Sequence, residues 1–345
     1  METQNQPSGN DRRNARGRFK ALTKMSSASR ILVTGGQGFV GRALVPKLQQ
    51  AWPLAEIMIT SRSRSSKQAQ GAVRVATLDI RDTQATKLLV QRYQPEMVVH
   101  LAAQANVGLS FQQPELTWQT NLHGSLNLFA ALEQHTPQAT LLVISSSDIY
   151  GASFASQQAL DENALLQPQN PYAASKAAMD LAAGALARTS QLKVLRARAF
   201  NHTGPGQDEG YVLPAFAAQI ARIEAQQEDI LKVGNLDAER DFLHVDDVAE
   251  AYVQLLMHAQ HLNSGEIFNI CSGQAHSVQS LLDQLLSLAT QKIQPAADPA
   301  RMRPSDLHRV QGCATKLKEA TGWHPSKSIS QTLEDLLNYW RQHIQ

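Results

Sequence analysis

The feature that most restricts the fold is a regular alternation of short hydrophobic runs, rich in β-branched residues, with longer segments of helical period. The strand candidates are residues 30–34, 56–60, 73–77, 96–102, 140–146 and 193–200, and the helix candidates lie near 38–50, 82–93, 115–135 and 171–190. Strands that are hydrophobic almost throughout are typical of a parallel sheet covered by helices on both faces. The sequence therefore predicts an α/β fold with a doubly wound parallel sheet.

The composition excludes several other classes of protein. A hydrophobic share of 43% and a charged share of 18% over 345 residues are ordinary for a globular chain, which excludes a wholly disordered protein. No apolar run approaches the ~20 residues that span a bilayer, so we expect no membrane partner. The two cysteines, Cys271 and Cys313, cannot form a disulfide framework, which fits a cytoplasmic location. The eleven histidines are scattered, and we expect no metal site.

Charge is spread unevenly along the chain. Residues 1–30 carry seven basic and two acidic side chains, so the rest of a chain whose net charge is +2 is mildly acidic. An enzyme of nucleic acids should carry its basic surface on the folded domain, and we therefore expect no nucleic-acid partner. Residues 1–29 lack apolar periodicity and are interpreted as a flexible basic tail, within which Met25 would be a natural start.

A glycine-rich turn follows the first strand candidate. The segment TGGQGFVG places Gly35, Gly38 and Gly41 where the strand gives way to a helix that begins with Phe39 and Val40. Glycine permits the sharp turn and lets a pyrophosphate approach the backbone amides at the positive end of the helix. Directly after the first strand of a βαβ unit, this pattern predicts a Rossmann-type dinucleotide site.

After Phe200 the alternation loosens into a loop rich in glycine, proline and aspartate. The sequence predicts a dinucleotide-binding domain at 30–202, to which a helix and a strand return at 246–272. Residues 203–245 and 273–345 are expected to form a smaller substrate-binding lobe. Helices of period near 3.6 close this lobe at 277–289 and 330–344, and another lies near 214–227.

The end of the second strand candidate indicates which dinucleotide binds. An NAD enzyme would carry an acidic residue there, whereas this chain has Ser61 and Arg62, followed by Ser63 and Arg64. A guanidinium beside a hydroxyl suits a 2′-phosphate. We therefore predict NADP(H), with NAD(H) as the alternative cofactor, and expect Asp79 to accept a hydrogen bond from the adenine amino group.

Tyr172 and Lys176 lie four residues apart at the start of a predicted helix, so their side chains project from one face. A neighbouring ammonium stabilises a phenolate, and this spacing therefore suits a tyrosine that transfers protons near neutral pH. The run VISSSDIYG ends the fifth strand candidate at the carboxyl edge of the sheet, where open α/β folds bind ligands. A serine there can bond the same substrate oxygen that the tyrosine protonates.

These motifs resemble the extended short-chain dehydrogenase/reductases that act on nucleotide sugars. The resemblance runs from about Arg30 to the C-terminus and rests on the glycine turn, HLAAQ, NLHG, the serine-rich strand end, Tyr172 with Lys176, and RDFLHVDDVAEAY. FNHTGPGQ, DPARMRPSD and TGWHP are most similar to the GDP-6-deoxy-4-keto-D-mannose reductases.

The resemblance implies the roles of individual residues. Tyr172 matches the catalytic acid, Lys176 the lysine that tunes it and holds the nicotinamide ribose, and Ser146 their polar partner, with Ser147 as the near alternative. The further cofactor-binding residues that it implies are Phe39, Val40, Ile80, Leu101, Ala102 and Ala103, and the substrate-binding residues are Ser147, Asp148, Asn201, Arg240 and Arg303.

The implied reaction is the NADPH-dependent reduction of the 4-keto group of GDP-4-keto-6-deoxy-D-mannose to a GDP-6-deoxyhexose, GDP-D-rhamnose. The alternatives are a GDP-mannose 4,6-dehydratase or another nucleotide-sugar epimerase or dehydratase. The dehydratases carry a glutamate where this chain has Asp148, which reaches about one methylene less. A protein that senses NADP(H) without turnover is a more distant alternative. The resemblance also implies a homodimer packed through the helices near 115–135 and 171–190.

Overall fold

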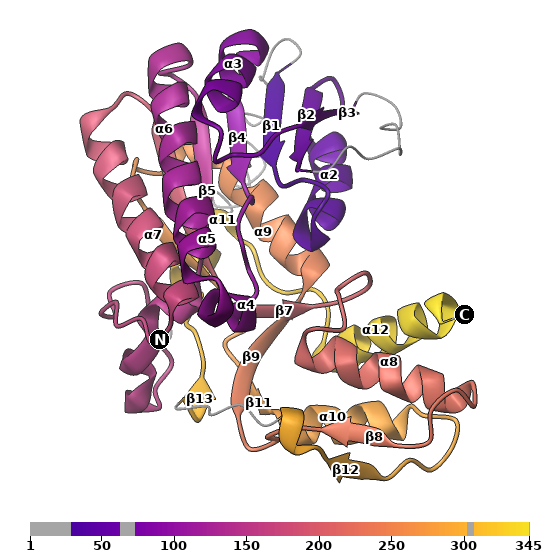
Figure 1. The fold of residues 1–345 in the computed structure, drawn as a ribbon. Helices are drawn as coiled ribbons and strands as arrows, with labels where there is room; N and C mark the ends of the chain where they lie inside the picture. The colour runs from indigo at the N-terminus through magenta and orange to yellow at the C-terminus, as the bar shows by residue number, and fades with distance from the viewer. Residues whose placement is uncertain (1–28, 63–72, 302–306, 345) are drawn as a thin grey trace, which may run out of the picture.

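The computed structural model describes residues 29–62, 73–301 and 307–344, so Arg303 and all but the last residue of the predicted basic tail lie outside the described residues. The centre of the fold is a seven-stranded sheet in the order β10-β6-β5-β4-β1-β2-β3, with all neighbours parallel (Figure 1). Its strands are β1 (Arg30–Thr34), β2 (Glu56–Ser61), β3 (Val73–Thr77), β4 (Met97–His100), β5 (Thr140–Ser146), β6 (Lys193–Ala199) and β10 (Ile267–Ile270). The predicted parallel sheet is confirmed, with the strands at the expected positions.

Helices cover both faces of this sheet. One layer contains α3 (Thr83–Tyr93), α6 (Gly124–His135) and α7 (Pro171–Thr189), and the other contains α2 (Phe39–Ala51) and α9 (Val245–Met257) (Figure 1). Alternate residues of a strand face opposite layers, and on β5 both kinds are hydrophobic because both faces are buried. None of the helices within the described residues has the length and apolar content that crossing a membrane requires.

The helix expected near 115–135 is present, but it contains a π-helical turn. The chain forms α4 (Val107–Gln112) and α5 (Pro114–Trp118), then a π-helical turn at Gln119–His123, and only then α6. The wide turn buries Asn121, whose Oδ1 accepts from the backbone N of Gln104 at 2.7 Å and whose Nδ2 donates to Ser175 Oγ at 3.0 Å. These bonds tie the segment after β4 to α7, and a helical period alone cannot reveal them.

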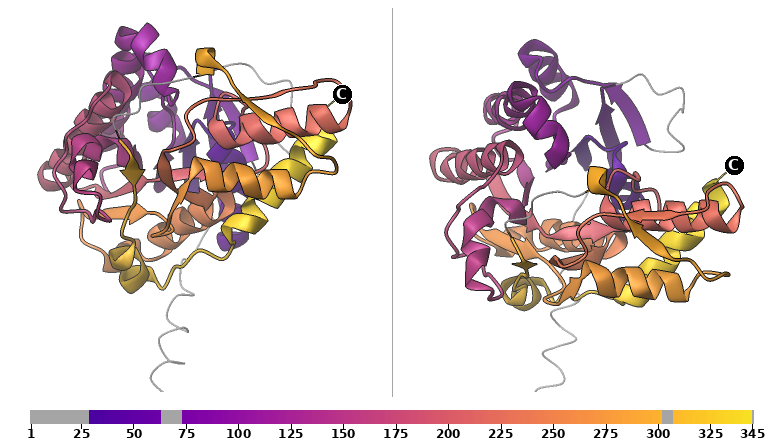
Figure 2. Two further views of the ribbon diagram at one scale, coloured as in Figure 1. Left: turned by 90° about the horizontal axis from the view of Figure 1, so that it is seen from below. Right: turned by 60° about the horizontal axis from the view of Figure 1, so that its bottom comes forward.

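A third hydrophobic cluster lies apart from the two that flank the sheet, among α8 (Val212–Glu224), α10 (Val278–Ser287) and α12 (Ile329–His343) (Figure 2). These are the three helices predicted near 214–227, 277–289 and 330–344. The short strands around them are β7 (Asn201–Thr203), β8 (Leu231–Val233), β9 (Glu239–His244), β11 (Ala275–Ser277), β12 (Pro295–Ala297) and β13 (Arg309–Val310). The helix α11 (Thr315–Thr321) was not expected from the sequence.

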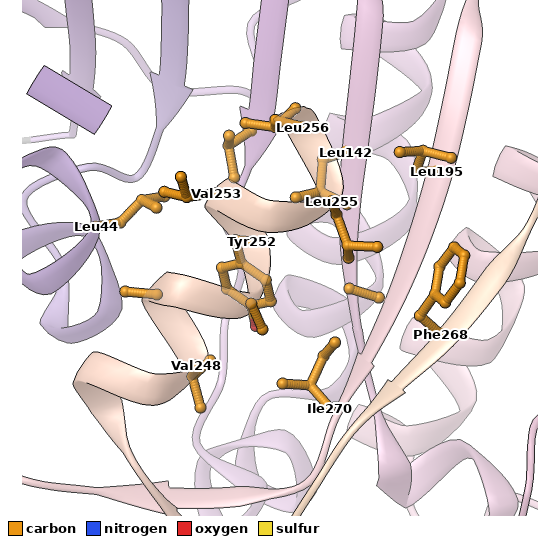
Figure 3. Close-up of a cluster of buried hydrophobic side chains, with 14 of the residues drawn as sticks. Leu44, Leu142, Leu195, Val248, Tyr252, Val253, Leu255, Leu256, Phe268 and Ile270 are labelled. Atoms are coloured by element: carbon orange, nitrogen blue, oxygen red, sulfur yellow. The ribbon is translucent and has the colours of Figure 1, made fainter. Parts of the chain in front are cut away.

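At the edge of the main sheet, α9 packs against α2, and β10 pairs with β6. Figure 3 shows side chains of α9, among them Val248, Tyr252 and Leu255, pointing into a cluster that contains Leu142 of β5 and Ile270 of β10. Tyr252 is fully buried. Its hydroxyl has no hydrogen-bond partner among the described residues.

A charged network is buried on the other side of the sheet. Asp180 of α7 is fully buried and accepts hydrogen bonds from Arg196 at 2.9 Å and from Arg198 at 3.0 and 3.2 Å. Arg198 also donates to the hydroxyl of Tyr150, which in turn donates to Oδ1 of Asn269 at 2.7 Å. The two arginines are alternate residues of β6 and therefore face the same helix. Asp180 provides the carboxylate that a pair of buried guanidinium groups requires.

Candidate active site

The glycine turn has the geometry that a dinucleotide site requires. Gly35 has a φ of +69°, and a Cβ there would lie 2.9 Å from the backbone of Ala102. A Cβ on Gly41 would lie 2.3 Å from the carbonyl oxygen of Gly36. Gly38 is the N-cap of α2 and makes no side-chain cap, so no capping side chain covers the first-turn amides of Phe39 and Val40. Gly36, which we did not single out in the sequence, packs equally closely, since its Cβ would lie 2.7 Å from Ile59.

The residues expected at the adenosine end lie together after β2 and β3. Ser61 ends β2 beside Arg62, and Asp79 with Ile80 follows β3. Both oxygens of Asp79 accept hydrogen bonds from Arg81, at distances down to 2.5 Å, and these bonds lower the pKa of Asp79. The Arg62 charge lowers this pKa further, which indicates that both guanidinium groups lie near Asp79. Arg81 escaped the sequence analysis, and Ser63 and Arg64 lie outside the described residues.

The residues Leu101, Ala102 and Ala103 follow β4 at the carboxyl edge of the sheet. The backbone N of Ala102 donates to Thr34 Oγ1 at 3.2 Å. The same hydroxyl lies 2.7 Å from Nδ1 of His100, whose Nε2 lies 2.8 Å from Ser125 Oγ. Burial lowers the pKa of His100 to about 3, so this ring is neutral. The network fixes the ends of β1 and β4 on either side of the glycine turn.

Tyr172, Lys176 and Ser146 meet at the end of β5. Tyr172 lies in the first turn of α7, which Asn170 caps by accepting from the backbone N of Ala173 at 2.8 Å. The side chain of Ser146 lies close enough to the phenol of Tyr172 to lower its pKa. Lys176 Nζ donates to the carbonyl of Ile144, two residues earlier on β5, at 2.5 Å. The near alternative, Ser147, is the first residue of the next turn, and both serines are buried.

The electrostatics of this group differ from the simple expectation. Burial raises the pKa of Tyr172 above its ordinary value, and the neighbouring Asp148 charge raises it further, while Ser146 acts in the opposite direction. Burial lowers the pKa of Lys176 to about 8. The ammonium of Lys176 donates to the carbonyl of Ile144. The phenol is therefore protonated near neutral pH and able to donate a proton.

Two residues expected to bind substrate lie on separate elements, Asp148 near the phenol and Arg240 near Asp148. The backbone N of Asp148 donates to Ser146 Oγ at 3.2 Å. Burial raises the pKa of the Asp148 carboxyl, and the positive charge of Arg240, from β9, partly offsets this rise. Tyr211, the N-cap of α8, also lies close enough to raise the pKa of Tyr172. No local sequence signal distinguished Tyr211.

Asn201 and Arg303 complete the list of expected site residues. Asn201 is half-buried and begins β7, where it pairs with Phe242 of β9, the strand that also carries Arg240. Arg303 lies outside the described residues. Among the described residues, no group of histidine, cysteine, aspartate or glutamate side chains has the arrangement of a metal site.

The fold and the residues at the carboxyl edge of the sheet define an NAD(P)-dependent oxidoreductase of the short-chain dehydrogenase type. The profile of the family described as GDP-mannose 4,6 dehydratase matches residues 32–336, and the chain belongs to this family.

Individual relatives agree with this assignment. The chain is 36% identical to GDP-6-deoxy-D-mannose reductase of Pseudomonas aeruginosa over 91% of this chain and 98% of the relative. It is similar to the solved structure of RMD from Pseudomonas aeruginosa complexed with NADPH, with a TM-score of 0.79, 34% identity, and coverage of 92% of this chain and 100% of that one. It is also similar to a UDP-glucose 4-epimerase from Thermotoga maritima, with a TM-score of 0.81, 26% identity, and coverage of 92% and 100%.

Proposed function

We propose that this protein uses NADPH to reduce the 4-keto group of GDP-4-keto-6-deoxy-D-mannose, which gives the GDP-6-deoxyhexose GDP-D-rhamnose. The observation that carries the proposal is the placement of Tyr172 and Lys176 on the first turns of α7 beside Ser146 at the carboxyl end of β5, where Lys176 Nζ donates to the carbonyl of Ile144. The 36% identity to a GDP-6-deoxy-D-mannose reductase over nearly the whole chain supports the substrate class. The similarity to RMD complexed with NADPH supports the cofactor.

The chemistry follows from the placement of these side chains. When bound, NADPH supplies the hydride that carbon 4 of the hexose receives. Tyr172 donates its phenolic proton to the oxygen on carbon 4, so that a C=O group becomes CH–OH. Ser146 bonds the same oxygen and holds it within reach of the phenol. Lys176 keeps a positive charge close to the phenolate that remains, which the solvent then reprotonates.

The proposed cofactor site is the turn at Gly35, Gly38 and Gly41, with the first-turn amides of α2 facing the pyrophosphate. Ser61 and Arg62 would take the 2′-phosphate that distinguishes NADP(H) from NAD(H), which is the alternative cofactor. Because Arg81 already holds Asp79, the carboxylate would meet the adenosine as part of an ion pair. The turn fits a dinucleotide because its glycines have no side chains, which leaves room for a pyrophosphate to approach the backbone.

We assign the sugar nucleotide to the second lobe, residues 203–245 and 273–345, facing the dinucleotide-binding domain of residues 30–202 and 246–272. Arg240, with its guanidinium near Asp148, would bind the diphosphate, and Asn201 would bond its oxygens. Asp148 would contact the hexose. The separate hydrophobic cluster of α8, α10 and α12 supports this division of the chain.

The second candidate is a GDP-mannose 4,6-dehydratase, which the family description and the position of Asp148 favour. Such an enzyme oxidises carbon 4, removes water across carbons 5 and 6, and needs a base near carbon 5. Two incubations separate the candidates: GDP-mannose with NADP⁺, and GDP-4-keto-6-deoxymannose with NADPH, each followed by mass spectrometry of the sugar nucleotide. We expect product only in the second incubation. A 4-keto-6-deoxy product in the first would overturn the reductase assignment.

We also propose a homodimer that packs through α6 and α7, which lie side by side on the outer face of the sheet (Figure 1). Both helices leave leucines exposed there, with Leu126 at 42% and Leu181 at 60% exposure. Light scattering after size exclusion should give twice the chain mass, and Leu181→Glu should give the monomer. A wild-type monomer at micromolar concentration would contradict the dimer.

A further inference from the structure

One arginine joins the glycine turn to a loop of the proposed substrate side. Arg42 lies on α2, one residue after Gly41. Its Nη1 donates to the carbonyl of Gln37 in the turn at 3.1 Å, and its Nη2 donates to the carbonyl of Gly206 at 2.6 Å. A single planar guanidinium therefore fixes the distance between the dinucleotide turn and a segment 164 residues further along the chain.

A second contact lies beside the first. The ring of Phe39, the first residue of α2, stacks on the ring of His202, with the planes 4° apart and the centroids 6.1 Å apart. His202, the middle residue of β7, and Gly206, in the turn after this strand, are the two ends of a short segment that we call the 202–206 loop. The next residue, Gln207, donates from Nε2 to the carbonyl of His202 at 3.2 Å and keeps the two ends together. The first turn of α2 thus holds the loop 202–206 at both ends.

The other side of the loop belongs to the proposed sugar-nucleotide site. β7 begins with Asn201 and pairs with β9, and Asn201 lies opposite Phe242, two residues after Arg240. The loop leads through Tyr211 into α8. A shift of residues 202–206 would therefore move the backbone that carries Asn201 and change its position relative to Arg240.

We propose that Arg42 is a positioning residue that couples the two ligand sites of this protein, so that the dinucleotide and the sugar nucleotide each strengthen the binding of the other. The inference rests on the proposed function. A phosphate bound to the first-turn amides of α2 restricts the motion of Gln37 and Phe39. Because the Arg42 guanidinium bonds both Gln37 and Gly206, it restricts the motion of Gly206 as well. Ordering a segment once, for the benefit of both ligands, is a recognised source of positive cooperativity.

Titration calorimetry with GDP and NADP⁺ tests the coupling without turnover. In the wild type, we expect the Kd of GDP to fall about tenfold when NADP⁺ is saturating, and the Kd of NADP⁺ to fall by the same factor with GDP, because coupling is reciprocal. Arg42→Ala should bring both ratios to about one, with the Kd of each single ligand changed less than threefold. Arg42→Lys keeps one donor for Gly206 and should restore part of the ratio.

His202→Leu removes the ring contact independently of Arg42 and should also lower the ratio. Arg92→Ala, at an exposed arginine on α3, is the matched control and should keep the full tenfold effect. A wild-type ratio near one, or an Arg42→Ala protein with the wild-type ratio, would overturn the inference. If the wild type reduces the keto sugar but shows no coupling, only this inference fails. If it binds neither GDP nor NADP⁺, the proposed function fails as well.

Discussion

For two buried tyrosines, we predict that replacement by phenylalanine changes the free energy of unfolding in opposite directions. Tyr150 and Tyr252 are both fully buried, but only Tyr150 has hydrogen-bond partners for its hydroxyl. Tyr150 donates to Asn269 Oδ1 at 2.7 Å and accepts from Arg198 at 3.0 Å. The hydroxyl of Tyr252 lies in the cluster between α9 and the sheet (Figure 3) without a partner among the described residues. Replacement of each by phenylalanine removes the same hydroxyl and keeps the ring.

The expected changes follow from these contacts. Tyr150→Phe leaves the buried Oδ1 of Asn269 without a donor and removes an acceptor from a buried guanidinium, which should lower the free energy of unfolding by about 2–3 kcal/mol. Tyr252→Phe removes a hydroxyl that loses its hydrogen bonds to water on folding and gains none in the protein. The substitution should therefore raise the free energy of unfolding by about 1 kcal/mol. The two variants should therefore differ by roughly 3–4 kcal/mol.

Urea unfolding of the apoenzyme, followed by circular dichroism at 222 nm, measures both changes. The slope m should stay constant, since neither substitution alters the surface exposed on unfolding, and the midpoints should move in opposite directions. The reasoning is refuted if Tyr252→Phe destabilises the protein by more than about 1 kcal/mol, because its hydroxyl must then have a stabilising partner.

The remaining predictions concern the site. Tyr172→Phe should lower kcat by about 10³-fold while the Kd of NADPH stays within twofold, and retained turnover would remove the phenol from the reaction. Arg62→Ala should raise the KM for NADPH about tenfold and leave the KM for NADH unchanged, whereas equal KM values in variant and wild type would leave the NADP(H) preference without a cause. Since the pKa of Lys176 is lowered to about 8, its ammonium is present below that pH and lost above it. The kcat/KM should therefore fall as the pH rises through about 8, and Lys176→Arg should flatten that limb.

The sequence predicts the sheet well because each strand is a local signal. A strand with both faces buried must be hydrophobic at successive positions, as the runs at 30–34 and 140–146 are, and helices must separate parallel strands. The glycine turn is local too. The helix near 115–135 was predicted, but its π-turn was missed because that turn depends on bonds from Asn121 to Gln104 and Ser175, which no helical period records.

Pairings between distant side chains could not be predicted from the sequence. The run KVLRARAF carries two arginines in a strand with both faces covered, and only the fold reveals that both bond the carboxylate of Asp180 on α7. The ion pair between Arg81 and Asp79 at the adenosine end could not be predicted either, because the sequence of a short turn does not fix the direction of its side chains. For Tyr172 and Lys176, the spacing predicts a shared face. The bond from Lys176 to the Ile144 carbonyl depends on how far β5 is shifted along its axis relative to α7, which the sequence does not show.

The pKa of the phenol also bears on the direction of the reaction. Reduction needs a protonated Tyr172 as its acid, whereas a dehydratase begins by oxidising carbon 4 and needs the phenolate as a base. In this structure, burial and Asp148 both raise the Tyr172 pKa, and the Lys176 ammonium is held by Ile144. An oxidised nicotinamide brings a positive charge that favours the phenolate, whereas the reduced ring is neutral. The protonated phenol that this site favours is the form that a reduction of the keto group needs.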